Sequence, residues 1–260
     1  MSKQDKEMTL VGHLQELRVR LMWTIGYFVV TLIIGFMLSD YLVRYFKNSP
    51  AAENIVWNVF GFTDSIRVYL QFTFLIAFAL TLPFILFQVW RFVAPGLTKT
   101  EQRATAWFIP IAFLLFIVGV SFAYFIIFPM IIQFLSQISD QLQVEETYGI
   151  SQYFGFMFNI IIPFGLLFEL PVIVVFLTRI GVVQPKLLTK FRKIAYLLLV
   201  TIAAMITPPE LVTNILVSIP LILLYEFSIW LSRIVYIRRQ KKLASEELLD
   251  KETETEQEKE

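Results

Sequence analysis

The sequence predicts an all-α integral membrane protein that crosses the bilayer six times, with both termini on the cytoplasmic side. The first observation is composition: 57% of the 260 residues are hydrophobic and 17% are charged, whereas soluble domains are about 45–50% apolar and about 25% charged. The second is the alternation of long apolar runs with short polar segments. The third is the distribution of Lys and Arg, which sets the orientation of membrane helices.

The polar segment at residues 91–103 separates two apolar runs that are each long enough to cross a bilayer. Pro95-Gly96 is a strong turn signal, so the chain is expected to reverse here. Glu101 lies just before the second run, near a helix N-terminus, where the helix dipole favours an anion. The segment is therefore predicted to be a tight cytoplasmic loop that presents a carboxylate.

The chain is predicted to have three parts. Residues 1–20 are polar, with apolar positions at helical spacing, and are expected to form an interfacial helix. Residues 21–232 form the transmembrane domain. Residues 233–260 form a basic and then acidic tail, expected to be largely disordered from Ser245 because it has few large apolar side chains. The predicted spans are residues 21–38, 68–90, 104–128, 153–177, 194–206 and 211–231.

The fifth of these runs is the shortest, because it has only about 13 residues where a crossing helix needs about 20. It is either re-entrant or a full span that thins the bilayer locally. With six spans and a cytoplasmic N-terminus, 19 of the 22 Lys and Arg face the cytoplasm. Only Arg44, Lys47 and Arg67 lie outside. A re-entrant fifth run would place the basic tail outside, so the charge distribution favours six spans.

Several classes of chemistry are excluded or disfavoured. There is no Cys and only one His, His13, so thiol chemistry and multi-His metal sites are excluded within one chain. We find neither a glycine-rich phosphate-binding loop nor a nucleophile–base pair. The chain is thus predicted not to be an enzyme, to need no metal or other cofactor, and not to bind nucleic acid.

Two carboxylates are predicted at the cytoplasmic surface, Glu16 and Glu101. Both have arginines nearby: Arg18 and Arg20 follow Glu16, and Arg103 follows Glu101. One interpretation is that each forms an exposed ion pair of little energetic consequence. The other is that the pair of carboxylates binds a cationic ligand.

Glu169 differs because it lies inside an apolar span, where a charge costs at least a few kcal/mol on insertion scales and usually has a function. Pro163 and Pro171 free backbone carbonyls nearby, which would make the site polar. Gln88 in the second span is a candidate partner. The alternative is that Glu169 pairs with another helix only for packing.

Two further carboxylates have structural interpretations. Pro208, Pro209 and Glu210 join the last two runs and are interpreted as a hairpin turn. Glu226 lies toward the inner end of the sixth span, where an interfacial anchor or an interhelical pair is expected.

Four ordered motifs resemble one known family. His13-Leu-x-Glu-Leu-Arg-x-Arg-Leu21 precedes the first span, and Phe87-Gln-Val-Trp-x-Phe-Val-x-Pro-Gly-Leu97, followed by Glu101 and Arg103, forms the first cytoplasmic loop. Phe164-Gly-Leu-Leu-Phe-Glu-Leu-Pro171 lies in the fourth span, and Thr207-Pro-Pro209 with Leu224-Tyr-Glu226 in the last hairpin. Each motif is weak alone, but together they resemble the TatC family, the signal-receptor subunit of the twin-arginine protein translocase.

The resemblance implies a six-helix, glove-shaped protein of the cytoplasmic membrane. It implies recognition of Arg-Arg signal peptides on the cytoplasmic face and export of folded proteins driven by the proton-motive force. It also implies self-association and single-span partners of the TatA/TatB type. By position, Glu16 and Glu101, flanked by Arg18 and Arg103, would meet the twin arginines. Glu169 and Gln88 would belong to a polar concavity within the membrane.

Two positions depart from the family pattern. The loop usually reads Glu-Arg-Arg, but here Gln102 stands between Glu101 and Arg103. The hairpin usually reads Pro-Pro-Asp, but here Glu210 keeps the negative charge on a longer side chain. From the residues alone two functions stay open: a receptor and translocation scaffold for exported peptides, or a proton-coupled carrier of small solutes centred on Glu169.

Overall fold

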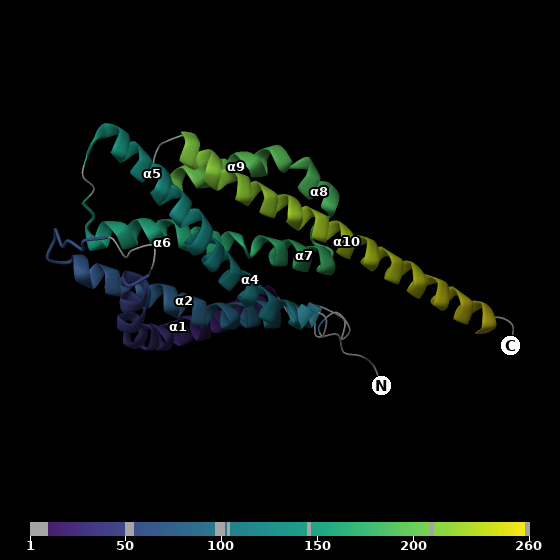
Figure 1. The fold of residues 1–260 in the computed structure, drawn as a ribbon. Coiled ribbons are helices and arrows are strands. Elements are labelled where there is room, and N and C mark those ends of the chain that lie inside the picture. Colours follow the sequence, from purple (N-terminus) through teal and green to yellow (C-terminus); the bar gives the residue numbers. More distant parts are fainter. Residues whose placement is uncertain are drawn as a thin grey trace. The chain divides into compact units, whose positions relative to one another are not determined.

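The protein is all-α in the part of the chain that the computed structural model describes, which is residues 10–49, 55–96, 102, 105–144, 147–207 and 211–257 (Figure 1). The predicted fold class is therefore confirmed. The helical elements are α1 Leu10–Lys47, α2 Asp64–Val93, η2 Ala94–Gly96, α4 Phe108–Phe122, η3 Ala123–Ile127, α5 Phe128–Leu142, α6 Ile150–Leu167, α7 Leu170–Ile180, α8 Pro185–Lys190, α9 Arg192–Ile206 and α10 Leu211–Gln257.

Five helical segments in the described residues are long and apolar enough to cross a membrane: Gln15–Lys47, Asp64–Gly96, Phe108–Leu142, Ile150–Ile180 and Leu211–Lys241. They contain the first four predicted spans nearly in full and the whole of the sixth. The fifth predicted span coincides with α9, whose 15 residues rise only about 22 Å at 1.5 Å per residue. The short run predicted from the sequence is thus a short helix, less than the roughly 30 Å of a hydrocarbon core.

The first predicted boundary, between an interfacial segment and a span at residues 20 and 21, is not a break in the structure. A single helix, α1, runs for 38 residues from Leu10 to Lys47. No proline interrupts this stretch, and its leucines, arginines and glutamate are good helix formers. Hydropathy changes near Leu21, but nothing in the sequence ends the helix there.

The chain between the third and fourth predicted spans is also helical as far as Leu142. The five residues Ala123–Ile127 form a π-helical turn, in which the N–H of Phe128 donates to the carbonyl of Ala123. A proline inside an α-helix normally collides with the carbonyl one turn back. The wider π-turn just before Pro129 relieves this conflict, so α4, η3 and α5 continue without a loop.

The C-terminal tail was predicted to be largely disordered from Ser245, but α10 is helical to Gln257. The predicted disorder of this tail stays a prediction. Low hydrophobicity excludes a packed core but not a helix, and the tail is rich in Glu, which favours helix.

The chain forms two compact units, Met1–Gly165 and Leu166–Glu260. In the first unit α1 and α2 run side by side (Figure 1). Gly35 makes this close approach possible, because a Cβ there would lie 2.6 Å from the carbonyl oxygen of Thr73. Thr31 and Thr81 share a buried hydroxyl hydrogen bond of 2.7 Å between the same helices, which satisfies both groups without water.

The rest of the first unit's core is aromatic. Phe72 of α2 packs edge-on against Phe154 and Phe158 of α6, with ring centroids 5.2 and 4.8 Å apart. Phe128 of α5 packs on Tyr153 at 5.3 Å. These separations lie in the range where aromatic pairs attract. The packing explains part of the high Phe content, since interlocking rings hold helices together where lipid supplies no hydrophobic driving force.

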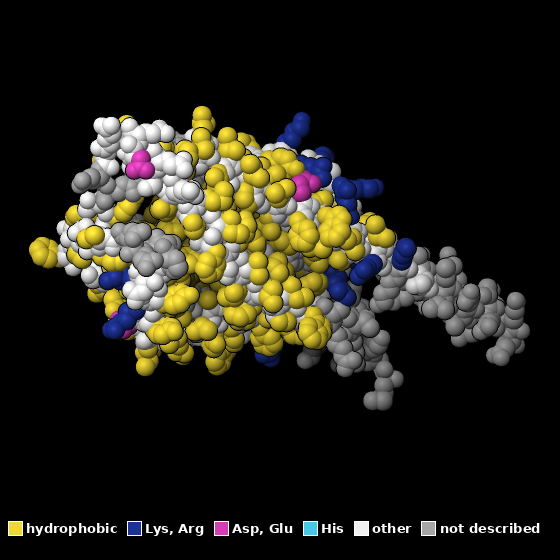
Figure 2. All heavy atoms as spheres, viewed as in Figure 1, with side chains coloured by type: hydrophobic (Ala, Val, Ile, Leu, Met, Phe, Trp, Pro, Cys, Tyr) yellow, Lys and Arg dark blue, Asp and Glu magenta, His cyan; other side chains and the backbone are white. Residues whose placement is uncertain are grey.

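In the second unit α10 packs along α7, α8 and α9. Thr178 of α7 and Ser232 of α10 share a buried hydroxyl hydrogen bond of 2.7 Å. This contact repeats the arrangement of Thr31 and Thr81 in the first unit. Apolar side chains cover most of the visible surface (Figure 2), as expected for helices that face lipid.

Gly35→Val is expected to destabilise the first unit, because its side chain would push α1 away from the backbone of α2. The expected loss is about 1–3 kcal/mol, as for other overpacking changes. It should appear as a lower thermal unfolding temperature (Tm) of the purified protein in detergent. Gly26 on the same helix has open space around its Cβ position, so Gly26→Val is the matched control and should leave Tm nearly unchanged. Equal Tm values for the two variants would contradict the close approach at Gly35.

Candidate functional site

A polar cluster lies at one end of the α1–α2 pair and consists of Glu16, Arg20 and Gln88. Arg20 donates from Nε to Glu16 Oε1 at 3.1 Å and also contacts that oxygen through Nη2. Its Nη1 donates to Gln88 Oε1 of α2 at 3.4 Å. Arg20 thus bridges the two helices, and we call this group the Glu16–Arg20–Gln88 cluster.

The cluster is shielded from solvent. The side chains of Arg20 and Glu16 are only 13% and 23% exposed, so the ion pair is not the weak surface pair considered from the sequence. Glu16 Oε2 is buried and has no hydrogen-bond partner among the described residues. A carboxylate accepts up to about four hydrogen bonds. Glu16 therefore keeps half of its hydrogen-bonding capacity for another donor.

Helix geometry separates Arg18 from this cluster. Residues four apart on a helix share a face, whereas residues two apart do not. Arg20 thus lies beside Glu16, and Arg18 is exposed on another side of α1. The predicted peptide-binding role of Arg18 stays a prediction, but Arg20 is the arginine that contacts Glu16. The spacing of four residues between Glu16 and Arg20 indicates this pairing in the sequence.

Two side-chain hydrogen bonds hold the ends of the first loop close together. Trp90 Nε1 of α2 donates to Thr105 Oγ1 at 3.0 Å. Gln102 Nε2 donates to the carbonyl oxygen of Ala94 at 2.8 Å, so the residue that departs from the family pattern binds the C-terminal end of α2. Glu101 and Arg103 lie outside the described residues, and their predicted roles stay predictions.

Glu169 occupies the break between α6 and α7. Phe168 and Glu169 form a turn, and Glu169 is the N-terminal cap residue of α7, with Pro171 in the first turn of that helix. The residue is only 4% exposed. Neither carboxylate oxygen has a hydrogen-bond partner among the described residues. The helix dipole favours an acidic group at this position, but a buried carboxyl without partners is costly, and the functional role expected for Glu169 stays a prediction.

The other predicted site residues fall in two groups. Gln88 was expected to accompany Glu169, but its contact in the structure is Arg20. Glu169 belongs to the other unit, so the Gln88–Glu169 pairing stays a prediction. Pro208, Pro209 and Glu210 of the hairpin lie outside the described residues.

Glu226 forms the interhelical pair that the sequence indicated. It accepts a hydrogen bond of 2.6 Å from Arg192 Nη2 of α9 and a second from the hydroxyl of Tyr196. Tyr225, its neighbour on α10, donates to the carbonyl oxygen of Leu188 at 3.0 Å. The three contacts tie α8, α9 and α10 together at one end of the second unit, which gives Glu226 a structural role.

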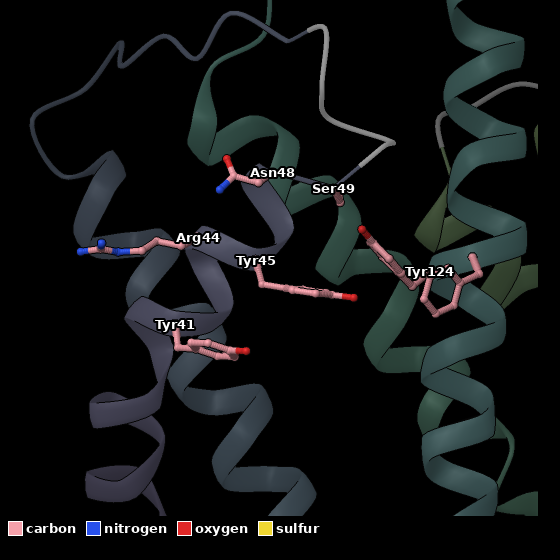
Figure 3. Close-up of a pocket in the computed structure, with 7 residues that line it drawn as sticks. Tyr41, Arg44, Tyr45, Asn48, Ser49 and Tyr124 are labelled. Carbon is pink, nitrogen blue, oxygen red and sulfur yellow. The ribbon is translucent and has the colours of Figure 1, made fainter.

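A hollow of about 400 Å³ lies at the opposite end of α1 from the cluster. Figure 3 shows Tyr41 and Tyr45 projecting from α1 toward the side where Tyr124 lies, whereas Arg44 points the other way. Arg44 forms a 3.0 Å ion pair with Asp40, which also accepts a 2.6 Å hydrogen bond from Tyr69. The described walls of the hollow are thus mainly aromatic rings, and Arg44 is engaged outside it.

These features define a multi-pass α-helical membrane protein with a partly buried arginine–carboxylate cluster at one end of its first helix pair. A family model described as "Sec-independent protein translocase protein (TatC)" matches residues 12–220. The chain therefore belongs to the TatC family, as the sequence motifs predicted, and is a membrane component of a protein translocase.

The relatives are similar over nearly their full length. The Sec-independent protein translocase protein TatC of Halalkalibacterium halodurans is 47% identical over 250 residues, which is 95% of this chain and 99% of that protein. TatCy of Bacillus subtilis is 45% identical over 240 residues, 92% and 94% of the two chains. A crystal structure described as the twin arginine translocase receptor TatC has a TM-score of 0.76 at 31% identity and covers 86% of this chain and 99% of that one.

The coupling between Glu16 and Arg20 can be measured with a double-mutant cycle. Glu16→Gln and Arg20→Gln should each lower the Tm of the purified protein, and the double variant should lose less than the sum, because the single variants leave one partner unpaired. A coupling free energy of about 1.5–3 kcal/mol is expected for a hydrogen bond to a charged group. The same cycle on the exposed pair Asp40 and Arg44 should give a smaller coupling. Additive effects at Glu16 and Arg20 would contradict the bridge.

Proposed function

We propose that this chain is the receptor subunit of a twin-arginine translocase, which binds Arg-Arg signal peptides on the cytoplasmic face of the cell membrane. In this proposal Glu16 and Glu101 bind the two arginines, and Arg18 and Arg103 lie beside them. Single-span partners of the TatA/TatB type and further copies of the chain complete the translocase. It exports folded proteins and is driven by the proton-motive force.

The single observation that carries this proposal is the half-satisfied carboxylate of Glu16. Its Oε1 is already bound by one guanidinium, and its Oε2 is without a partner in the described chain. A second guanidinium is a matched donor for such an oxygen, because charge-assisted hydrogen bonds to carboxylates are about twice as strong as neutral ones. The torsion that rotates a Glu carboxylate is broad, and 23% of the side chain is exposed, so an incoming arginine can reach it.

Two further arguments concern orientation and energy source. In the predicted topology 19 of 22 Lys and Arg face the cytoplasm, which supports cytoplasmic termini and a cytoplasmic position for the Glu16–Arg20–Gln88 cluster. The sequence has no recognisable phosphate-binding loop, which is consistent with transport driven by an ion gradient. The receptor name carried by the structural relative supports the same assignment.

Arg-Arg peptides are expected to bind more tightly than Lys-Lys peptides of equal charge, because Arg offers a planar fork of donors that Lys lacks. Glu16→Ala and Glu101→Ala should each reduce Arg-Arg binding severely without unfolding the protein. The measurement is peptide affinity to the purified chain at two salt concentrations. Asp40→Ala is the matched control, since it removes a carboxylate with an arginine four residues on from the other end of α1. Equal affinity for the Arg-Arg and Lys-Lys peptides would contradict recognition of the guanidinium and would show that the peptides bind only through their net charge.

A second candidate function is a proton-coupled carrier of small solutes centred on Glu169. It is favoured by one observation: both carboxylate oxygens of this buried residue lack partners among the described residues. A carrier centred on Glu169 does not explain why the Glu16–Arg20–Gln88 cluster keeps a buried carboxylate oxygen without a partner in the described residues. A receptor needs a surface site for a cationic peptide, so the first proposal explains more of the structure.

Glu169→Ala should insert stably but export poorly, while binding signal peptide nearly as well as wild type. Glu169 lies 11 residues before Ile180 at the end of α7, which is about 16 Å along the helix axis from the basic loop that follows. The measurements are export rate in cells and peptide affinity in vitro. Glu169→Gln is the companion variant, because it keeps the shape of the side chain. Export by Glu169→Ala at the wild-type rate would show that the functional interpretation of this residue is wrong.

A further inference from the structure

The second unit has a hollow of about 400 Å³ between α8 and α10, lined by Pro185, Lys186, Thr189, Arg233, Tyr236 and Ile237. It lies at the end of the unit where Tyr225 binds the carbonyl of Leu188. Neither the Glu16–Arg20–Gln88 cluster nor Glu169 contributes to it. It is therefore a separate feature of the chain.

The hollow is basic. Lys186 and Arg233 stand on its two walls, and both side chains are exposed. The segments that form this end, residues 179–193 and 233–241, together contain nine Lys and Arg and no Asp or Glu. Figure 2 shows Lys and Arg side chains gathered around α8 and the neighbouring part of α10. The positive potential at the hollow is therefore not neutralised by these segments.

The acidic side chain that the structure describes on α8, α9 and α10 is already occupied. Glu226 of α10 accepts hydrogen bonds from Arg192 and Tyr196 of α9. Among the described residues Arg233, by contrast, makes only a long contact of 3.4 Å from Nη2 to Thr189 Oγ1. A guanidinium has five donors, so most of those of Arg233 remain available to an anion. The hydroxyls of Thr189 and Tyr236 add neutral hydrogen-bonding groups.

The remaining walls are apolar. Pro185 is buried beneath the hollow, and Ile237 is 55% exposed at its edge. Along α10 the apolar surface continues through Trp230 and Phe227, which are 55% and 48% exposed. Two cations beside an exposed apolar strip suit a ligand with an anionic head and a hydrocarbon body rather than a free ion.

We propose that this hollow binds the phosphate of an anionic glycerophospholipid, with Arg233 and Lys186 on the phosphate oxygens and the acyl chains along the apolar strip of α10. Basic pockets between helices at the cytoplasmic side are a recurring way of binding such headgroups. Arg supplies a fork of donors that matches a phosphate, and Lys supplies a point charge. The bound lipid would hold α8 against α10 at the membrane surface.

The test uses the purified full chain in neutral detergent, with dioleoylphosphatidylglycerol, dioleoylphosphatidylcholine and sodium phosphate as three separate probes. Bound lipid is counted by native mass spectrometry, and Tm is followed at constant ionic strength. Phosphatidylglycerol should bind and raise Tm, whereas phosphatidylcholine at the same concentration should bind at least tenfold more weakly. Sodium phosphate should neither raise Tm nor displace the bound lipid. Displacement by equimolar phosphate would overturn the lipid assignment.

Variants locate the site. Arg233→Gln should weaken phosphatidylglycerol binding about tenfold, the loss of roughly one charge-assisted hydrogen bond, and adding Lys186→Gln should weaken it further. Lys186→Arg should retain binding. The matched control is Lys190→Gln, which removes an exposed cation from the same short helix but does not line the hollow. Equal losses for Arg233→Gln and Lys190→Gln would overturn the site and leave only general attraction to an anionic surface.

Discussion

The structure depends first on the requirement that every backbone polar group be satisfied inside the hydrocarbon, where no water can accept or donate a hydrogen bond. Long helices meet this requirement. Three of the helices described here nevertheless continue through an internal proline: Pro83 in α2, Pro163 in α6 and Pro220 in α10. At a fourth proline, Pro129, a π-turn just before it lets the helix continue. It lets α4 and α5 join into one segment long enough to span.

The same requirement governs the side chains between the helices. Buried hydroxyls pair with one another across helices, as Thr31 does with Thr81 and Thr178 with Ser232. Charged side chains pair as well, Arg20 with Glu16 and Arg192 with Glu226. Glu169 is the exception, because it is buried without such a partner in the described residues. It lies at the one place in its span where the helix is broken, which is where polar groups inside a membrane are tolerated.

The sequence predicted the spans well and their ends poorly, for a physical reason. Hydropathy records which residues prefer lipid, so the apolar runs were evident. Helix ends are set by breakers and caps, and neither occurs near Leu21 or Ser245. The helices therefore continue through polar segments, as α1 and α10 do. At Pro129 a breaker was present, but the π-turn that compensates for it has no sequence signature.

In the Glu16–Arg20–Gln88 cluster, only the contact between residues close together in the sequence could be predicted. Arg20 is four residues from Glu16, so their pairing could be anticipated from helix periodicity. Gln88 is 68 residues from Arg20, and nothing in the sequence signals that contact, because it depends on the register of α2 against α1. That register is fixed elsewhere, by the close approach at Gly35 and the Thr31–Thr81 bond. Packing within the apolar helices thus positions the polar cluster at their end.

The cluster also has a consequence for how a receptor of the proposed kind would release its peptide. Arg20 already satisfies one oxygen of Glu16, so a peptide arginine gains only the remaining oxygen or replaces Arg20 in a near-equal exchange. The net free energy of such an exchange is small compared with that of pairing an isolated carboxylate, because one guanidinium replaces another on the same carboxylate. Selectivity for arginine is kept, since a guanidinium matches a carboxylate better than a lysine ammonium does. A preformed arginine–carboxylate pair therefore favours specific but reversible binding, which a translocase needs if each peptide must leave before the next arrives.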